Sequence, residues 1–150
     1  MDDKMSRTET SDLVSLVSAF AGKRILVLGD AILDEYLTGD CSRISPEAPV
    51  PVVRVHNARR VLGGAANTAA NIAALGGRVS LIAHVGADDA GRTLQECARA
   101  GGIDLRIVDN GTPTLRKTRV VGQHQQIVRL DYEDVRSPDA QFEAAVLAAF

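Results

Sequence analysis

Two acidic residues stand where an open α/β sheet normally binds its ligand. Asp30 and Asp34 follow the apolar run of residues 25–28, and the ligands of such sheets bind beyond the carboxyl ends of the strands. A carboxylate at this place can accept hydrogen bonds from two sugar hydroxyls. Taken alone, Asp34 is more simply explained as an acid of a turn or hairpin.

Residues 63–67, with the sequence Gly-Gly-Ala-Ala-Asn, are the second candidate site. Gly63 and Gly64 open an alanine-rich helix predicted over residues 63–75, where the backbone can approach a ligand and the first-turn amides stay free to donate. Asn67 lies in that first turn and offers both a donor and an acceptor. The combination suits a neutral polyhydroxyl compound. A flexible helix start that packs closely on a sheet explains the same residues equally well.

The segment from Gly86 to Thr93 has the spacing of a phosphate-binding P-loop, with Arg92 in the position of the lysine. Asp88 and Asp89 contradict that function, because their carboxylates would repel the phosphate oxygens. We therefore expect Gly86 to end a strand and one of the two acids to cap the next helix. Catalytic triads and metal-ligand spacings are also absent from the sequence, and we assign no role to its histidines, which are His56, His84 and His124.

The composition is that of an ordinary globular chain. Its 150 residues are enough for one domain, and 45% of them are hydrophobic and 24% charged. The net charge of -2, together with three Phe, two Tyr and no Trp, argues against a nucleic-acid partner. Cys41 and Cys97 fit no metal spacing, the first dozen residues resemble no secretory leader, and no apolar run could span a bilayer. These features predict a cytoplasmic protein with no membrane partner.

The order of the expected elements predicts an α/β fold. Continuous apolar runs suggest buried parallel strands, and alanine-rich or amphipathic stretches between them suggest helices. The expected strands are 24–28, 79–85 and 105–108, and the expected helices are 12–20, 63–75, 89–100 and one that begins near Ser137-Pro138-Asp139. This last helix reaches Phe150 without a stop signal, which predicts a longer parent chain.

Four other segments alternate polar and apolar residues, as half-exposed strands do. They are residues 33–41, 51–55, 115–122 and 125–132, and the last two predict a hairpin. Three prolines, Pro46, Pro49 and Pro51, exclude a central strand between the first two segments. We therefore expect a doubly wound, mostly parallel sheet with helices on both faces and a small β-sheet appendage.

Three segments, taken in order, resemble the N-terminal half of the ribokinase-like (PfkB-type) carbohydrate kinases. They are Gly29-Asp30 with Asp34, the segment 63–67, and the segment from Val85 to Gly91. Within that family, residues 43–53 and 125–131 resemble the lid of the D-glycero-β-D-manno-heptose-7-phosphate kinases. The resemblance runs from about Ile25 to Asp134.

The resemblance implies ATP-dependent phosphorylation of O1 of heptose 7-phosphate to the 1,7-bisphosphate, with Mg²⁺, in the synthesis of ADP-heptose for lipopolysaccharide core. It also implies that residues 36–55 and 115–131 form a lid that clasps a second subunit in a homodimer. The residues that would bind the sugar are Asp34, Gly63, Gly64 and Asn67.

A phosphorylated sugar also requires cations. Lys117 and Arg119 lie two residues apart, so they project to the same face of their strand. With Arg129 they are our candidates for the C7 phosphate, through charge-assisted hydrogen bonds. A solvated basic face is the alternative, and Arg129 could simply pair with Asp131.

The aspartate that acts as general base in this family lies in a Gly-Ala-Gly-Asp segment of the C-terminal half. The sequence has no such segment, so we expect residues 1–150 to be the N-terminal part of one domain, without catalytic residues, and inactive alone. Three alternatives stay open. They are another kinase of the family acting on ribose, fructose or fructose-phosphate, a non-catalytic sugar-binding or dimerisation module, and, less favoured, a dinucleotide-dependent oxidoreductase, which lacks its glycine fingerprint here.

Overall fold

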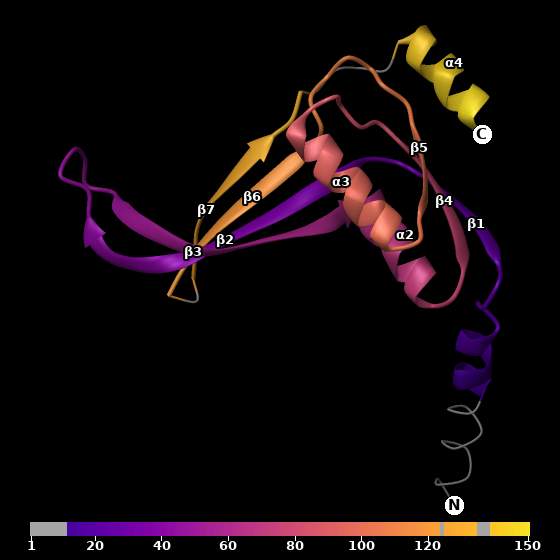
Figure 1. The fold of residues 1–150 in the computed structure, drawn as a ribbon, viewed down its shortest axis with the longest axis horizontal. Coiled ribbons are helices and arrows are strands. Elements are labelled where there is room, and N and C mark those ends of the chain that lie inside the picture. Colours follow the sequence, from indigo (N-terminus) through magenta and orange to yellow (C-terminus); the bar gives the residue numbers. More distant parts are fainter. Residues whose placement is uncertain (1–11, 124, 135–138) are drawn as a thin grey trace, which may run out of the picture.

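The computed structural model describes residues 12–123, 125–134 and 139–150, which form two β-sheets with helices (Figure 1). The first, which we name the central sheet, is parallel and has the strand order β1-β4-β5. The second, the outer sheet, has the order β3-β2-β6-β7. The strands are β1 (Arg24–Leu28), β2 (Ala31–Ile44), β3 (Pro51–Gly64), β4 (Arg78–Ala83), β5 (Asp104–Ile107), β6 (Arg116–Gly122) and β7 (Gln125–Tyr132).

The core lies where helices α2 (Ala65–Ala74) and α3 (Asp89–Ala100) cover the central sheet and the base of the outer sheet. Leu81 of β4, Leu94 of α3 and Leu33 of β2 belong to one buried cluster. Small side chains on α2, with Ala66 and Ala69 fully buried, let this helix approach the strands closely. The expected α/β fold with a parallel sheet is confirmed.

Strand β1 is less buried than its apolar sequence predicted. Val27 packs against the core, but Leu26 and Leu28 are 37% and 56% exposed. Among the described residues β1 pairs only with β4, so one of its edges has no neighbouring strand. The prediction that both faces of this strand are buried is therefore wrong for the described residues.

The outer sheet is larger than expected. We expected the second of its strands to end at Val55 and the helix to begin at Gly63, whereas β3 runs on to Gly64 and α2 begins at Ala65. The reason is that β3 pairs with β2 along almost its whole length, from Ile44 to Ala31. The hairpin of β6 and β7 agrees with the prediction.

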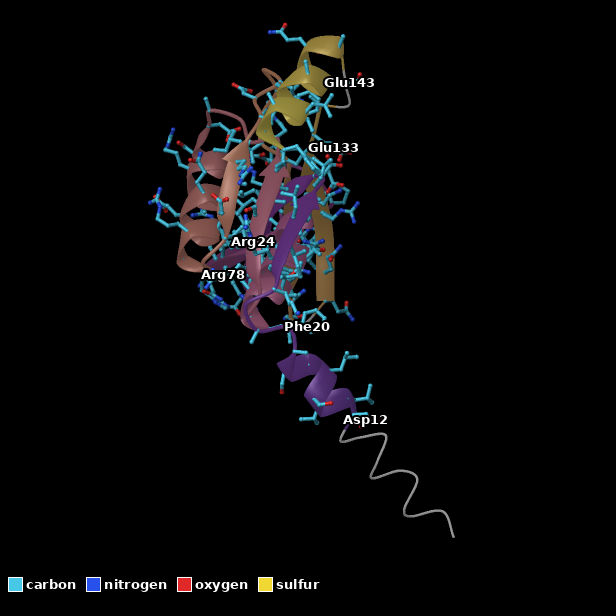
Figure 2. All side chains as sticks on the ribbon, turned by 90° about the vertical axis from the view of Figure 1, so that its right-hand side faces the viewer. Asp12, Phe20, Arg24, Arg78, Glu133 and Glu143 are labelled. Carbon is cyan, nitrogen blue, oxygen red and sulfur yellow. The ribbon has the colours of Figure 1, made fainter. Side chains whose placement is uncertain are left out.

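Two terminal helices bury little surface. Residues 12–18 are helical, and Figure 2 shows this helix extending away from the sheets with Asp12 at its far end. Helix α4 (Ala140–Ala149) has no buried residue, and its contact with β5 includes a hydrogen bond from Arg106 to the carbonyl of Ala149. Its apolar face thus remains open, as its sequence suggested, and the expected start at Ser137-Pro138 lies outside the described residues. None of the described helices has the length and apolar character needed to cross a membrane.

Candidate functional site

Asp34 lies against the backbone of Gly63. A methyl group at Gly63 would overlap with Oδ2 of Asp34, so the glycine leaves the space that the carboxylate fills. The antiparallel register of β2 and β3 causes this proximity, because it pairs Ile32 with Gly63 and Asp34 with Val61. The structure thus brings the candidate acid and the diglycine segment together.

Gly64, the last residue of β3, lies against Asp30 just after β1, and α2 begins at the next residue. The φ of Gly64, 57°, lies in the left-handed region, and a Cβ here would overlap with the carbonyl oxygen of Asp30. The same carbonyl accepts a hydrogen bond of 2.8 Å from the amide of Ala65. Asn67, in the first turn of α2, is exposed, and its side chain has no hydrogen-bond partner among the described residues.

The strand register places the proposed phosphate ligands on the same face of the outer sheet as Asp34. We name this the front face. Paired residues of neighbouring strands share a face, and β6 pairs Lys117 with Asp34 and Arg119 with Tyr36. On the other side of β6, β7 pairs Arg129 with Arg119. The spacing argument for Lys117 and Arg119 therefore agrees with the structure.

Arg119 forms an ion pair with Asp34. Its guanidinium donates a hydrogen bond of 2.5 Å to Oδ1 of Asp34 and stacks 5.2 Å from the ring centre of Tyr36. The hydrogen bond to Asp34 raises the pKa of Arg119 above its usual value, against the opposing effect of burial. The acid that we expected to bind the sugar is thus directly linked to one of the cations that we expected to bind the phosphate.

The other two cations are also paired. Lys117 lies 3.2 Å from Asp131 and 3.7 Å from Glu133, and Arg129 donates two hydrogen bonds, of 2.7 and 2.9 Å, to Asp131. These hydrogen bonds, that of Arg129 foremost, lower the pKa of Asp131. The alternative pairing of Arg129 with Asp131 is therefore present. Three cations face three carboxylates, so an incoming phosphate must exchange partners with them.

The sequence analysis missed a fourth cation on this face. Arg59 of β3 pairs with Tyr36 in the strand register, is exposed, and has no ion pair with any described residue. We overlooked it because the predicted strand ended at Val55. Residues 56–62, His-Asn-Ala-Arg-Arg-Val-Leu, do not alternate polar and apolar side chains, so the sequence gives no signal of period two for this position.

The Gly86–Thr93 segment is structural, as its two acids suggested. Asp88 is the N-cap of α3: its Oδ1 accepts from the amide of Gly91 at 2.7 Å, and its Oδ2 accepts from the amide of Thr114 at 2.9 Å. Gly86 in turn donates to Oγ1 of Thr114 at 2.9 Å. These bonds fix the chain just before β6, so this loop helps to hold the strand that carries Lys117.

A cleft of about 610 Å³ lies beyond the carboxyl ends of β1, β4 and β5. Asp30 lines it, together with His84, whose ring nitrogens lie 3.1 Å from the carbonyl oxygens of Val108 and Thr112. His84 is thus a satisfied residue, as expected, whereas His56 is exposed and His124 lies outside the described residues. The other residues that line the cleft include Asp109, Glu133, Asp134 and Asp139. Asp34 and Asn67 do not line this cleft.

The family model described as "pfkB family carbohydrate kinase" matches residues 23–148. Since this span includes most of the chain, the chain belongs to the pfkB family of carbohydrate kinases.

Two relatives share about half of their aligned residues with this chain. The "D-beta-D-heptose 7-phosphate kinase" of Bordetella bronchiseptica is 50% identical over 121 residues, which are 80% of this chain and 39% of that protein. The "Bifunctional protein HldE" of Azorhizobium caulinodans is 53% identical over 129 residues, 83% of this chain and 27% of that protein. The chain therefore spans between about a quarter and two fifths of the length of these relatives.

Solved structures confirm the ribokinase-like fold. A carbohydrate kinase from Agrobacterium tumefaciens superposes with a TM-score of 0.62 at 26% identity, over 73% of this chain and 35% of that chain. A ribokinase from Thermotoga maritima superposes with a TM-score of 0.53 at 23% identity, over 73% of this chain and 36% of that chain.

We predict that Asp88 makes the folded chain sensitive to acid. Burial raises its pKa, but hydrogen bonds from Gly91 and Thr114 outweigh this effect and hold the pKa below the ordinary 3.8. Its stabilisation is therefore complete above that value and is lost as the pH falls through the lower pKa of the folded state. Asp88→Asn keeps one capping oxygen but replaces Oδ2 with an amide group that cannot accept the hydrogen bond from Thr114. It should therefore lower the free energy of unfolding at pH 7 by about 1 kcal/mol, with a lower melting temperature, and should flatten the decline of the melting temperature between pH 5 and 2.

Thermal unfolding followed by circular dichroism at several pH values measures both effects. Asp89→Asn is the matched control, because this neighbouring carboxylate is exposed and pairs only with Arg92 on the same helix. Equal acid profiles for the two variants would show that Asp88 has no such role.

Proposed function

We propose that this chain forms the sugar-binding part of a kinase that transfers the γ-phosphoryl group of ATP to O1 of D-glycero-β-D-manno-heptose 7-phosphate. The O1–P bond forms, the bond from the γ-phosphorus to the bridging oxygen of ADP breaks, and the hydroxyl proton passes to a base. The 1,7-bisphosphate would feed ADP-heptose synthesis for lipopolysaccharide core, in the cytoplasm, where ATP is available. The printed name of the Bordetella bronchiseptica relative supports this substrate.

The observation that carries the proposal is the contact of Asp34 with both Gly63 and Arg119. It combines an acceptor for sugar hydroxyls, a backbone without side-chain obstruction, and a cation for a phosphate group. Asp34 and Asn67 would hold hydroxyls, while Gly63 and Gly64 let the backbone approach the ring. Such contacts contribute to phosphoryl transfer by positioning the attacking hydroxyl.

The phosphate at C7 would bind on the front face, to Lys117, Arg119 and Arg129. An arginine can exchange a carboxylate for a phosphate at little cost, because both anions accept bidentate charge-assisted hydrogen bonds. The outer sheet would then act as a lid, which keeps water from competing for the phosphoryl group.

The catalytic base, the anion hole and the nucleotide site would lie in the part of the longer relatives that this chain does not span. When bound, ATP would bring Mg²⁺ to neutralise the charge that develops on the phosphates. The described residues contain no group of three His, Cys, Asp or Glu side chains placed to hold a metal ion. Because the catalytic base and the nucleotide site would lie outside them, we propose that residues 1–150 alone do not turn over.

One observation favours a second candidate, a kinase of the same family for ribose, fructose or fructose-phosphate. The three candidate cations are already paired with carboxylates, and a sugar without a phosphate would leave those pairs intact.

A comparison of substrates for the longer natural protein separates the two candidates. We expect the highest kcat/KM for heptose 7-phosphate, and a KM at least tenfold higher for the same heptose without its phosphate, because that sugar loses the charge-assisted bonds. Initial rates with ATP and each sugar give both constants. A preference for ribose or fructose would contradict the heptose assignment.

Substitutions of Asp34 and Asn67 test the sugar contacts. Asp34→Asn should raise the sugar KM about 10- to 100-fold, since hydrogen bonds to a charged group contribute about 1.5–3 kcal/mol, and Asn67→Ala should raise it several-fold. Asp40→Asn on the same strand and Asn71→Ala on the same helix are the matched controls, because both residues are exposed. If the sugar KM and kcat of the test variants equal those of the controls, the assignment is wrong.

We also propose that the outer sheet joins two copies of the chain. The sheet ends in two edge strands, β3 and β7, and unpaired edges readily associate with another chain. It also exposes large apolar side chains, which are Ile44, Val55, Ile127, Val128, Leu130 and Tyr132. Covering them in a homodimer would remove this apolar surface from water.

We expect the longer protein to be a dimer at micromolar concentration and Leu130→Asp to dissociate it, because a buried unpaired carboxylate is costly. Sedimentation equilibrium measures the molecular mass. Val14→Asp, which places the same charge on an exposed apolar position outside the outer sheet, should remain dimeric. A monomeric wild-type protein would refute the proposal.

A further inference from the structure

The outer sheet consists of two antiparallel hairpins that meet side by side. Strands β2 and β3 form one hairpin, and β6 and β7 form the other. They join through the parallel pairing of β2 with β6, which we name the seam. No short turn connects the strands of the seam, because the chain passes through β3, α2, β4, α3 and β5 between them.

The proposed ligands of the sugar phosphate lie on both sides of this seam. Asp34 belongs to the first hairpin, whereas Lys117 and Arg119 belong to the second. A substrate that touches all three would bridge the seam, so its affinity depends on how firmly the two hairpins are held in register.

Two side-chain hydrogen bonds cross the seam within the described residues. On the front face Arg119 donates to Asp34. On the opposite face, Oγ1 of Thr118 donates to Oε2 of Glu35 at 2.9 Å. Each residue of the second pair is the direct neighbour of one residue of the first. Thr118 and Glu35 are paired in the strand register, whereas the bond from Arg119 to Asp34 runs diagonally between the two flanking pairs, so the two bonds hold the same short stretch of the seam from its two faces.

Both carboxylate oxygens of Glu35 accept a hydrogen bond. Glu35 is 8% exposed, and its other oxygen, Oε1, accepts a 2.9 Å hydrogen bond from Nε of Arg60 on β3. Burial would raise its pKa, but the hydrogen bonds from Arg60 and Thr118, with the charges of Arg60 and Arg116, keep the pKa below its usual value. One ionised carboxylate thus connects the three strands β3, β2 and β6.

Substrate binding would affect the two hydrogen bonds across the seam differently. Asp34 and Arg119 are both proposed ligands, so a sugar hydroxyl and a phosphate oxygen would compete with their mutual bond. Glu35 and Thr118 face away from that site, since neighbouring residues of a strand point to opposite faces. Their bond remains when the front pair is exchanged for substrate.

We propose that the hydrogen bond between Thr118 and Glu35 is a positioning contact. It keeps the two hairpins in register when the sugar phosphate binds Asp34 and Arg119 and replaces the hydrogen bond between them. This inference rests on the proposed function and extends it. Arg60 supports the contact by fixing the carboxylate of Glu35 from the other side. None of the three residues touches the substrate.

The test compares Thr118→Val with Thr118→Ser in the longer natural protein. Valine keeps the shape and the β-branching of threonine but removes the donor, whereas serine keeps the donor. We expect Thr118→Val to raise the KM for the sugar phosphate about tenfold, with kcat and the KM for ATP within about twofold of wild type. Thr118→Ser should restore the wild-type KM.

Hydrogen exchange of the amides in residues 116–122 gives a second readout that does not depend on turnover. In Thr118→Val these amides should exchange faster than in wild type, with a larger difference when the sugar phosphate is bound, because the front pair no longer holds the seam. In Thr118→Ser they should exchange as in wild type.

A purely structural role would lower the melting temperature of Thr118→Val without changing its KM for the sugar phosphate, and this result would overturn the inference while the proposed function stands. The wild-type kinetics decide the proposed function separately. If the wild-type protein phosphorylates no sugar phosphate, the proposed function fails and the positioning role falls with it.

Discussion

At Gly63 and Gly64 the backbone of β3 comes so close to its neighbours that one added carbon atom would overlap with them. The Cβ of the first residue would meet the carboxylate of Asp34, and that of the second would meet the carbonyl of Asp30. At this place β1 has just ended, β2 enters the outer sheet and α2 begins. The same close approach therefore joins the central sheet to the outer sheet and fixes the candidate acid beside the helix that carries Asn67.

Three of the four cations that we identify on the front face of the outer sheet are paired with carboxylates before any ligand binds. Lys117, Arg119 and Arg129 each pair with a carboxylate, which keeps the cations oriented and limits the cost of holding three positive charges near one another. A phosphate group would enter by exchange, with the released carboxylates free to accept hydrogen bonds from hydroxyls. The opposite face, where Glu35 is fully satisfied, undergoes no such exchange. One face of the sheet can therefore change partners while the other maintains the register.

Much of this site could be predicted locally. Three candidates were found from the chemistry of their residue types: Asp34 as a carboxylate acceptor, the diglycine segment as an open backbone, and Asn67 as both donor and acceptor. Lys117 and Arg119 were found because the period of a strand is two. Arg59 and Glu35 were missed for different reasons. The strand that carries Arg59 was ended too early, because residues 56–62 show no alternation of polar and apolar side chains and only the pairing with β2 extends the strand to Gly64. No role was predicted for Glu35, because its burial depends on Arg60 and Thr118, which come from two other strands.

The family motifs, the alternation of strands and helices, a cap at Asp88 or Asp89 and the residue types that could hold a sugar could all be predicted, because they depend on neighbours within a few positions of the chain. Which of those residues meet depends on the tertiary fold. The pairing of β2 with β6 joins segments more than 80 residues apart, and their register sets which charges neutralise one another. The fold also decides how far β1 is covered, and among the described residues this strand is paired on one edge only. Burial depends on which strands and helices lie beside it, whereas an apolar run indicates only that burial would be favourable.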